Sequence, residues 1–230
     1  MPLPLMVFAA GFGTRMGELT ADRPKPLIEV AGRPLIDHAL HLAEQVGASP
    51  IVVNTHYLAD QIAGHLARRQ VSLSHEPDRV LETGGGLRKA LPLLGQDPVM
   101  TLNSDAIWTG LNPLAQLMAR WDGARMDALL LLLPAQAATA YSGTGDFLLD
   151  EHGRLIRAKG AAGLVYLGAQ ILRTEALHTI DREVFSLNLL WDQMIENGRA
   201  FGLVHQGGWC DVGRPEGIAE AEALLKAPHV

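Results

Sequence analysis

Two glycines and an arginine follow the first apolar run of the chain and are its first candidates for chemistry. Residues 9–15 read Ala-Ala-Gly-Phe-Gly-Thr-Arg. Gly11 and Gly13 let backbone N–H groups approach a phosphate closely, and Arg15 can donate to two phosphate oxygens. Met16 replaces the third glycine of the dinucleotide pattern, and the Gly-Lys-Ser/Thr of a P-loop is missing. The turn therefore predicts phosphate binding of another kind, with a plain strand-to-helix turn as the alternative.

A lysine with a proline on each side is the second candidate. Lys25 lies between Pro24 and Pro26. The prolines remove two N–H donors and fix φ on both flanks, so this segment is stiff and not helical. A stiff backbone suits a charge that must be held in advance where negative charge develops in a transition state. The alternative is an exposed lysine in a proline-rich loop.

Two aspartates are candidate metal ligands. Asn103 and Asp105 follow an apolar run and would project to the same side of an extended chain. Mg²⁺ usually binds one or two carboxylates together with phosphate oxygens and water. Asp211, in the late segment Gly-Gly-Trp-Cys-Asp-Val-Gly, supplies a second carboxylate. We interpret the two aspartates as a metal pair, although each alone could be a turn or cap residue.

Residues 82–86, Glu-Thr-Gly-Gly-Gly, form a second glycine-rich segment. Three consecutive glycines lose much backbone entropy on folding, which favours a close approach of backbone to a flat or charged group. We predict a loop that opens a helix at about Leu87, whose N-terminus would favour anions. A flexible surface hairpin is the alternative.

Short apolar runs alternate with amphipathic stretches along most of the chain, a pattern typical of a sheet covered by helices. In the second half, apolar and polar residues alternate around Glu151-His152-Gly153, which predicts a hairpin. The sequence therefore predicts an α/β fold: a Rossmann-like, doubly wound mixed sheet with added antiparallel strands in the second half. One domain, 1–230, is expected. Ligands bind such sheets at the carboxyl ends of the strands, where the segments above lie.

Composition excludes several classes of protein. The chain has 230 residues, a formal net charge of -6 and 48% hydrophobic residues. Scattered basic residues and a negative net charge argue against nucleic-acid binding. No apolar run is long enough to cross a membrane, and the apolar N-terminus lacks the basic region of a signal peptide. A single cysteine, Cys210, permits no internal disulfide and fits a reducing compartment, so we expect a cytoplasmic protein.

Taken together, the segments AAGFGTRM, RPKPL, LETGGG, LNSDA and GGWCDVG resemble the sugar-1-phosphate nucleotidyltransferase family in order and approximate spacing. Within that family the chain looks most like the N-acetylmuramate α-1-phosphate uridylyltransferases of cell-wall recycling. The mannose- and heptose-1-phosphate guanylyltransferases are the nearest alternative. The resemblance implies a nucleotide-binding lobe at about 1–110 and a sugar-phosphate lobe at about 111–230. It also implies two partners, a nucleoside triphosphate and a sugar 1-phosphate, with Mg²⁺ as cofactor.

The resemblance also implies roles for individual residues. The catalytic cations would be Arg15 and Lys25, and the Mg²⁺ ligands would be Asp105 and Asp211. The nucleotide would be bound by Ala9, Ala10, Gly11, Gly13, Thr14, Arg15, Glu76 and Gly86. The sugar phosphate would be bound by Asn103, Gly145, Asp146 and Lys159. Relatives with such a lysine usually carry glutamate before it, whereas this chain has Ala158, so one hydroxyl contact is in doubt.

Two functions of other classes stay open at this point. A nucleotide-sugar glycosyltransferase could share the sheet and use Asn103-Ser104-Asp105 as a metal site, but it would not need Arg15 and Lys25. A non-catalytic nucleotide-sensing module would not need two metal carboxylates. Neither the base, the sugar nor the oligomeric state follows from the sequence.

Overall fold

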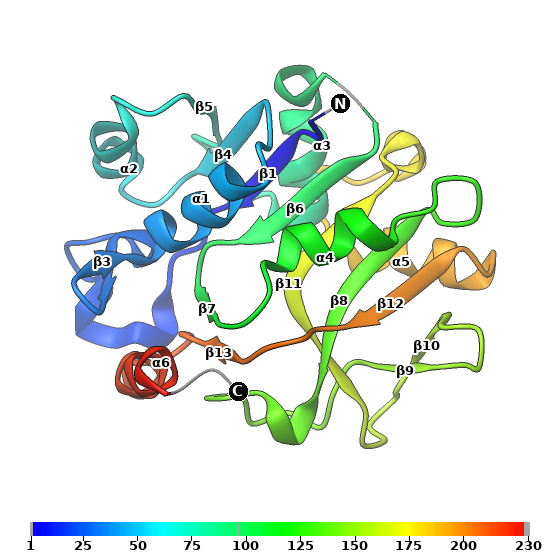
Figure 1. Ribbon diagram of the computed structural model, residues 1–230. Coiled ribbons are helices and arrows are strands. Elements are labelled where there is room, and N and C mark those ends of the chain that lie inside the picture. The colour runs from blue at the N-terminus through cyan, green and yellow to red at the C-terminus, as the bar shows by residue number, and fades with distance from the viewer. Residues whose placement is uncertain (1, 96, 228–230) are drawn as a thin grey trace.

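A sheet of nine strands runs through the protein in a computed structural model that describes residues 2–95 and 97–227 (Figure 1). Seven strands follow the order β10-β9-β11-β6-β1-β4-β5; β8 pairs with β11, and β12 pairs with β8. Their bounds are β1 Leu5–Phe8, β4 Ile51–Thr55, β5 Ser72–His75, β6 Val99–Asn103, β8 Ala128–Pro134, β9 Phe147–Leu149, β10 Leu155–Arg157, β11 Leu164–Leu172 and β12 Ala200–Val204.

The first half of the sheet is parallel. β1 lies between β4 and β6 and is parallel to both, and β5 continues the parallel arrangement beyond β4. Successive side chains of β1 point to opposite faces, so Leu5 and Val7 enter one hydrophobic cluster and Met6 enters another. Strands buried on both faces explain why this half of the sequence reads as continuous apolar runs.

The second half adds the expected antiparallel strands. β11 is antiparallel to β6 and to β8, and β9 forms a hairpin with β10 around the predicted turn at 151–153. β12 returns parallel to β8. The α/β class, the mixed sheet and the added antiparallel strands are thus confirmed.

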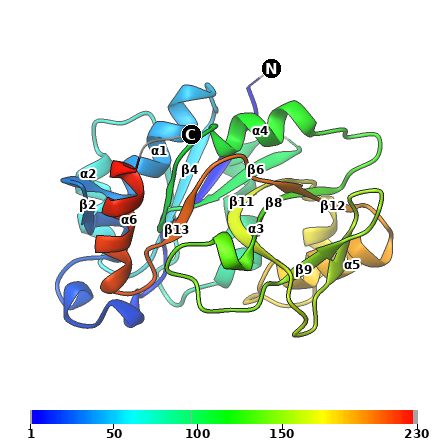
Figure 2. The same cartoon turned by 60° about the horizontal axis from the view of Figure 1, so that its bottom comes forward.

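Helices cover both faces of the sheet. Side chains of α1, α2 and α4 pack into one hydrophobic cluster, whereas those of α3 and α5 pack into the cluster on the other face. α6 lies beside two short ladders, β2–β3 and β7–β13 (Figure 2). The helices are α1 Leu35–Gln45, α2 Ala59–Leu66, α3 Glu82–Leu94, α4 Pro113–Arg120, α5 Asn188–Glu196 and α6 Glu216–Lys226, and the short strands are β2 Glu29–Val30, β3 Arg33–Pro34, β7 Ala106–Trp108 and β13 Trp209–Asp211. Among the described helices, none is long and apolar enough to cross a membrane.

The glycine-rich segment at 82–86 is not a loop, and that prediction is wrong. It forms the first turns of α3, with all three glycines buried. A Cβ at Gly84 would lie 2.3 Å from the Phe185 ring, and one at Gly85 would lie 2.3 Å from the carbonyl oxygen of Glu183. Gly84 and Gly85 are therefore needed because the chain around Glu183–Phe185 packs directly against the backbone of α3.

Replacing Gly84 by alanine is expected to destabilise the protein by roughly 1–3 kcal/mol, the usual penalty for overpacking. The helical Gly64 in α2 is the matched control, because a Cβ there meets no atom within 4 Å. Alanine at 64 should instead stabilise by about 0.5–1 kcal/mol, because alanine has the higher helix propensity. Urea denaturation of both variants measures the two free energies of unfolding. Equal effects would contradict the packing explanation.

Candidate active site

The glycine turn lies at the carboxyl end of β1 and lines a cavity of about 230 Å³, which we call the turn cavity. Here the structure brings together seven predicted residues from three segments of the chain. They are Ala9, Gly11, Gly13, Thr14, Arg15, Lys25 and Asp105. The carboxyl edge of the sheet is thus where the polar side chains converge, as expected for this class of fold.

The two glycines of the turn serve different purposes. Gly13 has φ +66°, and a Cβ there would lie 2.8 Å from the Cβ of Lys25, so the fold itself requires glycine at this position. Gly11 has no left-handed φ, and a Cβ there would meet nothing within 4 Å. The protein's own packing therefore does not explain Gly11, whereas the close approach of a ligand would.

Alanine at position 11 is accordingly expected to leave the free energy of unfolding almost unchanged while weakening nucleotide binding by about 10-fold or more, the effect of an overpacked contact of roughly 1–3 kcal/mol. Titration calorimetry with a non-hydrolysable triphosphate and urea denaturation measure the two quantities. Alanine at position 13 provides the contrast, because it should lower stability first. Unchanged nucleotide affinity in the Gly11 variant would contradict a contact between this residue and the nucleotide.

A chain of buried hydrogen bonds fixes the start of the turn. The Ala9 amide donates to Oδ1 of Asn54 at 2.8 Å, and Nδ2 of Asn54 donates to Oε1 of Glu76 at 2.8 Å. The Leu81 amide completes the chain by donating to Oε2 of Glu76 at 2.8 Å. A Cβ at Gly86 would lie 2.8 Å from Oε1 of Glu76, so only glycine fits there.

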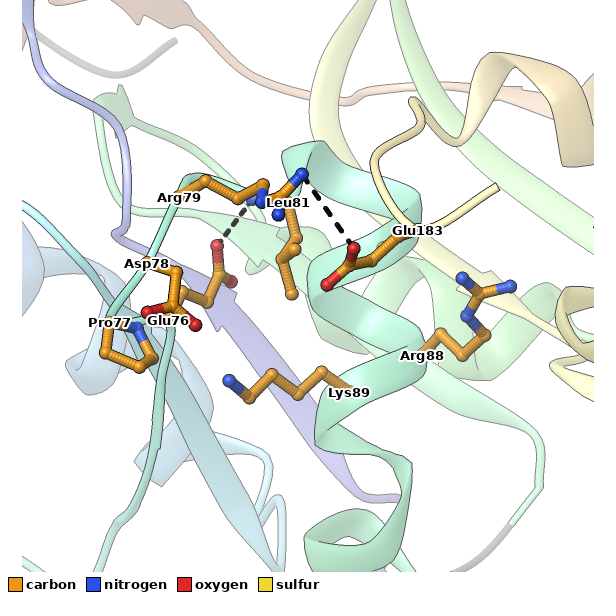
Figure 3. Close-up of a pocket in the computed structure, with 9 residues that line it drawn as sticks. Glu76, Pro77, Asp78, Arg79, Leu81, Arg88, Lys89 and Glu183 are labelled. Carbon is orange, nitrogen blue, oxygen red and sulfur yellow. Dashed lines mark hydrogen bonds and ion pairs between the residues drawn. The ribbon is translucent and has the colours of Figure 1, made fainter. Parts of the chain in front are cut away.

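Glu76 and Gly86 therefore connect the ends of β1, β4 and β5 to the start of α3. Glu76 is 1% exposed, and both of its carboxylate oxygens have protein partners. A cavity of about 280 Å³ lies between residues 76–81 and α3 (Figure 3). Arg79 faces Glu183 across it, with 3.9 Å between Nη1 and Oε2. Asn54, the central member of the chain, carried no local signal in the sequence.

Each proposed phosphate-binding cation is paired with a proposed metal ligand. Nζ of Lys25 donates to Oδ2 of Asp105 at 2.7 Å, and the Lys25 side chain is only 10% exposed. Nη1 of Arg15 lies 3.9 Å from Oδ2 of Asp211. A Cβ at Gly213 would lie 2.7 Å from that same oxygen, so glycine leaves room for this second pair. Asp105 and Asp211 are adjacent because the Val212 amide donates to the Asp105 carbonyl.

The surroundings of Asp211 suit a cation. Burial, followed by the negative charge of Asp105, raises the pKa of the Asp211 carboxyl, while Lys25, Arg15 and Arg214 act in the opposite direction. Two carboxylates that repel each other next to the glycine turn fit a divalent metal, whose charge would relieve that repulsion. Among the described residues, no group of three or more His, Cys, Asp or Glu side chains gathers at one point. These residues would therefore supply two ligands, leaving other positions to substrate oxygens and water.

Asp211 and Arg15 also line a cavity of about 360 Å³ with residues that the sequence analysis did not identify. Tyr141 and Arg214 belong to this group. Burial raises the pKa of the Tyr141 hydroxyl, and the carboxylates of Asp146 and Asp211 raise it further. No motif pointed to Tyr141, because its relation to Asp211 depends on the path of the chain between β8 and β9.

A fourth cavity, of about 270 Å³, adjoins the turn cavity through Phe8, which lines both. We call it the aromatic cavity because Phe147, Tyr166 and Trp191 form much of its wall. Two predicted residues line it, Asn103 and Asp146. Oδ2 of Asp146 accepts a hydrogen bond of 2.8 Å from the Tyr166 amide, which fixes the carboxylate at the end of the hairpin.

Gly145 and Lys159 have other surroundings. Gly145 has φ +112°, and a Cβ there would lie 2.6 Å from the carbonyl carbon of Gly163, so the fold itself requires glycine at this position. Lys159 is exposed, with φ +49°, and lies in neither the turn cavity nor the aromatic cavity. Its contact with a sugar phosphate stays a prediction.

The chain is similar in sequence and in fold to known proteins. The family profile described as a MobA-like NTP transferase domain matches residues 5–160. The N-acetylmuramate alpha-1-phosphate uridylyltransferase of Caulobacter vibrioides is 41% identical over 97% of this chain and 97% of its own length. The protein of the same name from Neisseria meningitidis is 34% identical over 96% of this chain and 98% of its own length. Among solved structures, HddC from Yersinia pseudotuberculosis superimposes with a TM-score of 0.77 at 21% identity, covering 97% of this chain and 100% of that one. This last likeness concerns the fold.

Proposed function

The chain belongs to the family of MobA-like NTP transferase domains, and on that premise we propose that it transfers a uridylyl group from UTP to N-acetylmuramate α-1-phosphate. The products are pyrophosphate and the UDP-sugar. Support for this choice of substrates comes from the names of the Caulobacter and Neisseria relatives. The chain is a nucleotidyltransferase, and the finer assignment of sugar and base is the proposal. We place the reaction in the cytoplasm.

The chemistry needs alignment and charge compensation more than a nucleophilic side chain. The sugar phosphate is already an anion, and one of its oxygens attacks the α-phosphorus while pyrophosphate leaves. Two unit negative charges about 4 Å apart repel by roughly 4 kcal/mol at an effective dielectric constant near 20. Arg15 and Lys25, both in the turn cavity, would offset that repulsion. Positioning and electrostatic stabilisation dominate phosphoryl-type transfers in general.

The protein's own groups have distinct tasks in this scheme. The backbone of the turn from Gly11 to Thr14 would bind the triphosphate, and Lys25 would donate to the phosphate under attack. Asn103 and Asp146 would hold the sugar in the aromatic cavity. Asp105 and Asp211 would hold Mg²⁺, which supplies positive charge to the phosphate oxygens when bound.

The observation that carries the proposal is the convergence of Arg15, Lys25 and Asp105 around the glycine turn, directly beside the aromatic cavity. A pyrophosphate-release assay tests it with UTP, GTP, CTP and dTTP, each against several sugar 1-phosphates in the presence of Mg²⁺. UTP with N-acetylmuramate 1-phosphate should give the highest kcat/KM. Preference for GTP with mannose or heptose phosphate would overturn only the choice of substrates. Absence of release from every pair would refute the transferase reaction.

A further inference from the structure

Arg157 lies in the aromatic cavity, at the end of β10, and no motif in the sequence pointed to it. Its guanidinium group stacks 4.8 Å above the centre of the Phe147 ring and 5.8 Å from the centre of the Trp191 ring. An arginine held on aromatic faces is oriented by them, because the planar cation favours stacking on the ring face. The side chain is 24% exposed.

One edge of the guanidinium is locked by protein groups. Nε donates to Oδ1 of Asp192 at 2.8 Å, and Nη2 approaches the same oxygen at 2.8 Å. Nη2 also donates to the Asn188 carbonyl at 3.2 Å. Nη1 has no hydrogen-bond or ion-pair partner anywhere in the described ranges, 2–95 and 97–227. The arginine is thus fixed in position while retaining donors for a ligand.

The walls around Arg157 decide which ligand fits. Phe8, Phe147, Leu187 and Trp191 form the apolar part of the cavity wall, and its polar part includes Asn103 and Ser186. An anion is the partner that best satisfies the two N–H groups of Nη1, and a carboxylate oxygen can accept a charge-assisted hydrogen bond from them. The 1-phosphate cannot be that anion, because the reaction requires it beside Lys25 and Asp105 in the turn cavity. The anion must therefore be carried by another part of the sugar.

We propose that Arg157 selects sugar 1-phosphates that carry a carboxylate on a ring substituent, which it binds through Nη1. The inference rests on the proposed function, since it concerns the acceptor of the same reaction. N-acetylmuramate meets this requirement through its lactyl ether, whereas N-acetylglucosamine is the same sugar without that group. Comparing these two sugars therefore measures the contribution of the carboxylate alone.

Steady-state kinetics with UTP and each of these two sugar 1-phosphates test the assignment. Arg157→Gln should lower kcat/KM for the muramate by roughly 10- to 100-fold, the range for one charge-assisted hydrogen bond, mainly through KM. For the glucosamine derivative the change should stay below about 3-fold. Arg157→Lys, which keeps the charge but not the guanidinium geometry, should recover part of the loss. Arg154→Gln, an exposed residue of the same hairpin, is the matched control and should behave as wild type.

Equal losses on both sugars would show that Arg157 only supports the fold, and unchanged kinetics on the muramate would also overturn the assignment. Calorimetric titration of N-acetylmuramate 1-phosphate into wild type and Arg157→Gln gives a second readout that needs no turnover. A weakening of at least about 10-fold supports the assignment, even if no triphosphate releases pyrophosphate and the proposed reaction fails. Equal affinities contradict it, even if the reaction proceeds.

Discussion

Replacing Lys25 by methionine is expected to lower kcat by on the order of 10²-fold or more, the usual effect of removing a pre-organised charge from a transition state. Methionine has a similar length, so the change removes the ammonium group and little volume. The lysine is held in advance by Pro24 and Pro26, by its burial and by its 2.7 Å hydrogen bond to Asp105. Rapid-quench measurement of the chemical step separates this effect from product release.

The same substitution leaves the Asp105 carboxylate without its cation, so we also expect a lower Tm. Assays therefore belong well below the Tm of the variant, with circular dichroism to verify that it is folded. Arg23→Met is the matched control: this exposed cation lies just before Pro24 and should keep nearly full turnover. A kcat for Lys25→Met within about 3-fold of wild type would contradict the role of a pre-organised charge.

Asp211→Asn is expected to reduce turnover to a similar extent, about 10²-fold or more, while raising thermal stability in the absence of divalent metal. Burial and the charge of Asp105 raise the pKa of this carboxyl in the folded protein. A raised folded pKa contributes stability at low pH that is lost as the pH rises through that pKa. Asparagine avoids the buried charge. Because the pKa of Asp211 is raised even with Arg15 nearby, we expect that removing the buried charge stabilises more than losing the 3.9 Å ion pair with Arg15 destabilises.

Thermal unfolding at several pH values measures the expected gain in stability of Asp211→Asn. The Tm of the variant should exceed that of wild type at pH 7, and the difference should shrink as the pH falls toward about 4, the ordinary range of an aspartate. Mg²⁺ should raise the Tm of wild type more than that of the variant, because a ligand of the native state stabilises it. Asp181→Asn, at an exposed position, should show none of these effects. A lower Tm for Asp211→Asn at every pH would refute the electrostatic explanation.

The fold could be predicted because the spacing of apolar residues, which distinguishes strands from helices, can be read from short stretches of sequence. Strands such as β1 and β6 are buried on both faces and read as short apolar runs, and the β9–β10 hairpin reads as alternation around a glycine turn. Residues 82–86 were predicted as a loop but form a helix, and the error has a physical reason. Glycine disfavours helix by its local propensity, but the chain at Glu183–Phe185 packs so closely that only glycine fits in α3. That contact joins segments about 100 residues apart.

The candidate site could be predicted only where chemistry and position coincide in a short motif. Gly11, Arg15, Lys25 and Asp105 each lie in such a motif, and the structure places all four in one cavity.

Asn54 and Arg157 lie at the ends of ordinary strands, with no distinctive neighbours in sequence. Their importance comes from partners elsewhere: Ala9 and Glu76 for Asn54, and Asp192 with two aromatic rings for Arg157. Such partners are visible only after folding.

The mutual pairing of cations and carboxylates has a consequence for the order of binding. If Lys25 binds the triphosphate and Asp105 binds the metal, as proposed, then a triphosphate would compete with the Asp105 carboxylate for the Lys25 ammonium, and a metal ion would compete with that ammonium for the carboxylate. Each ligand, once bound, releases the group that the other needs. Thermodynamic linkage then makes the effect reciprocal: the nucleotide should tighten metal binding by the same factor by which the metal tightens nucleotide binding. The pairing of Lys25 with Asp105 would thus favour arrival of the nucleotide and the metal as one complex.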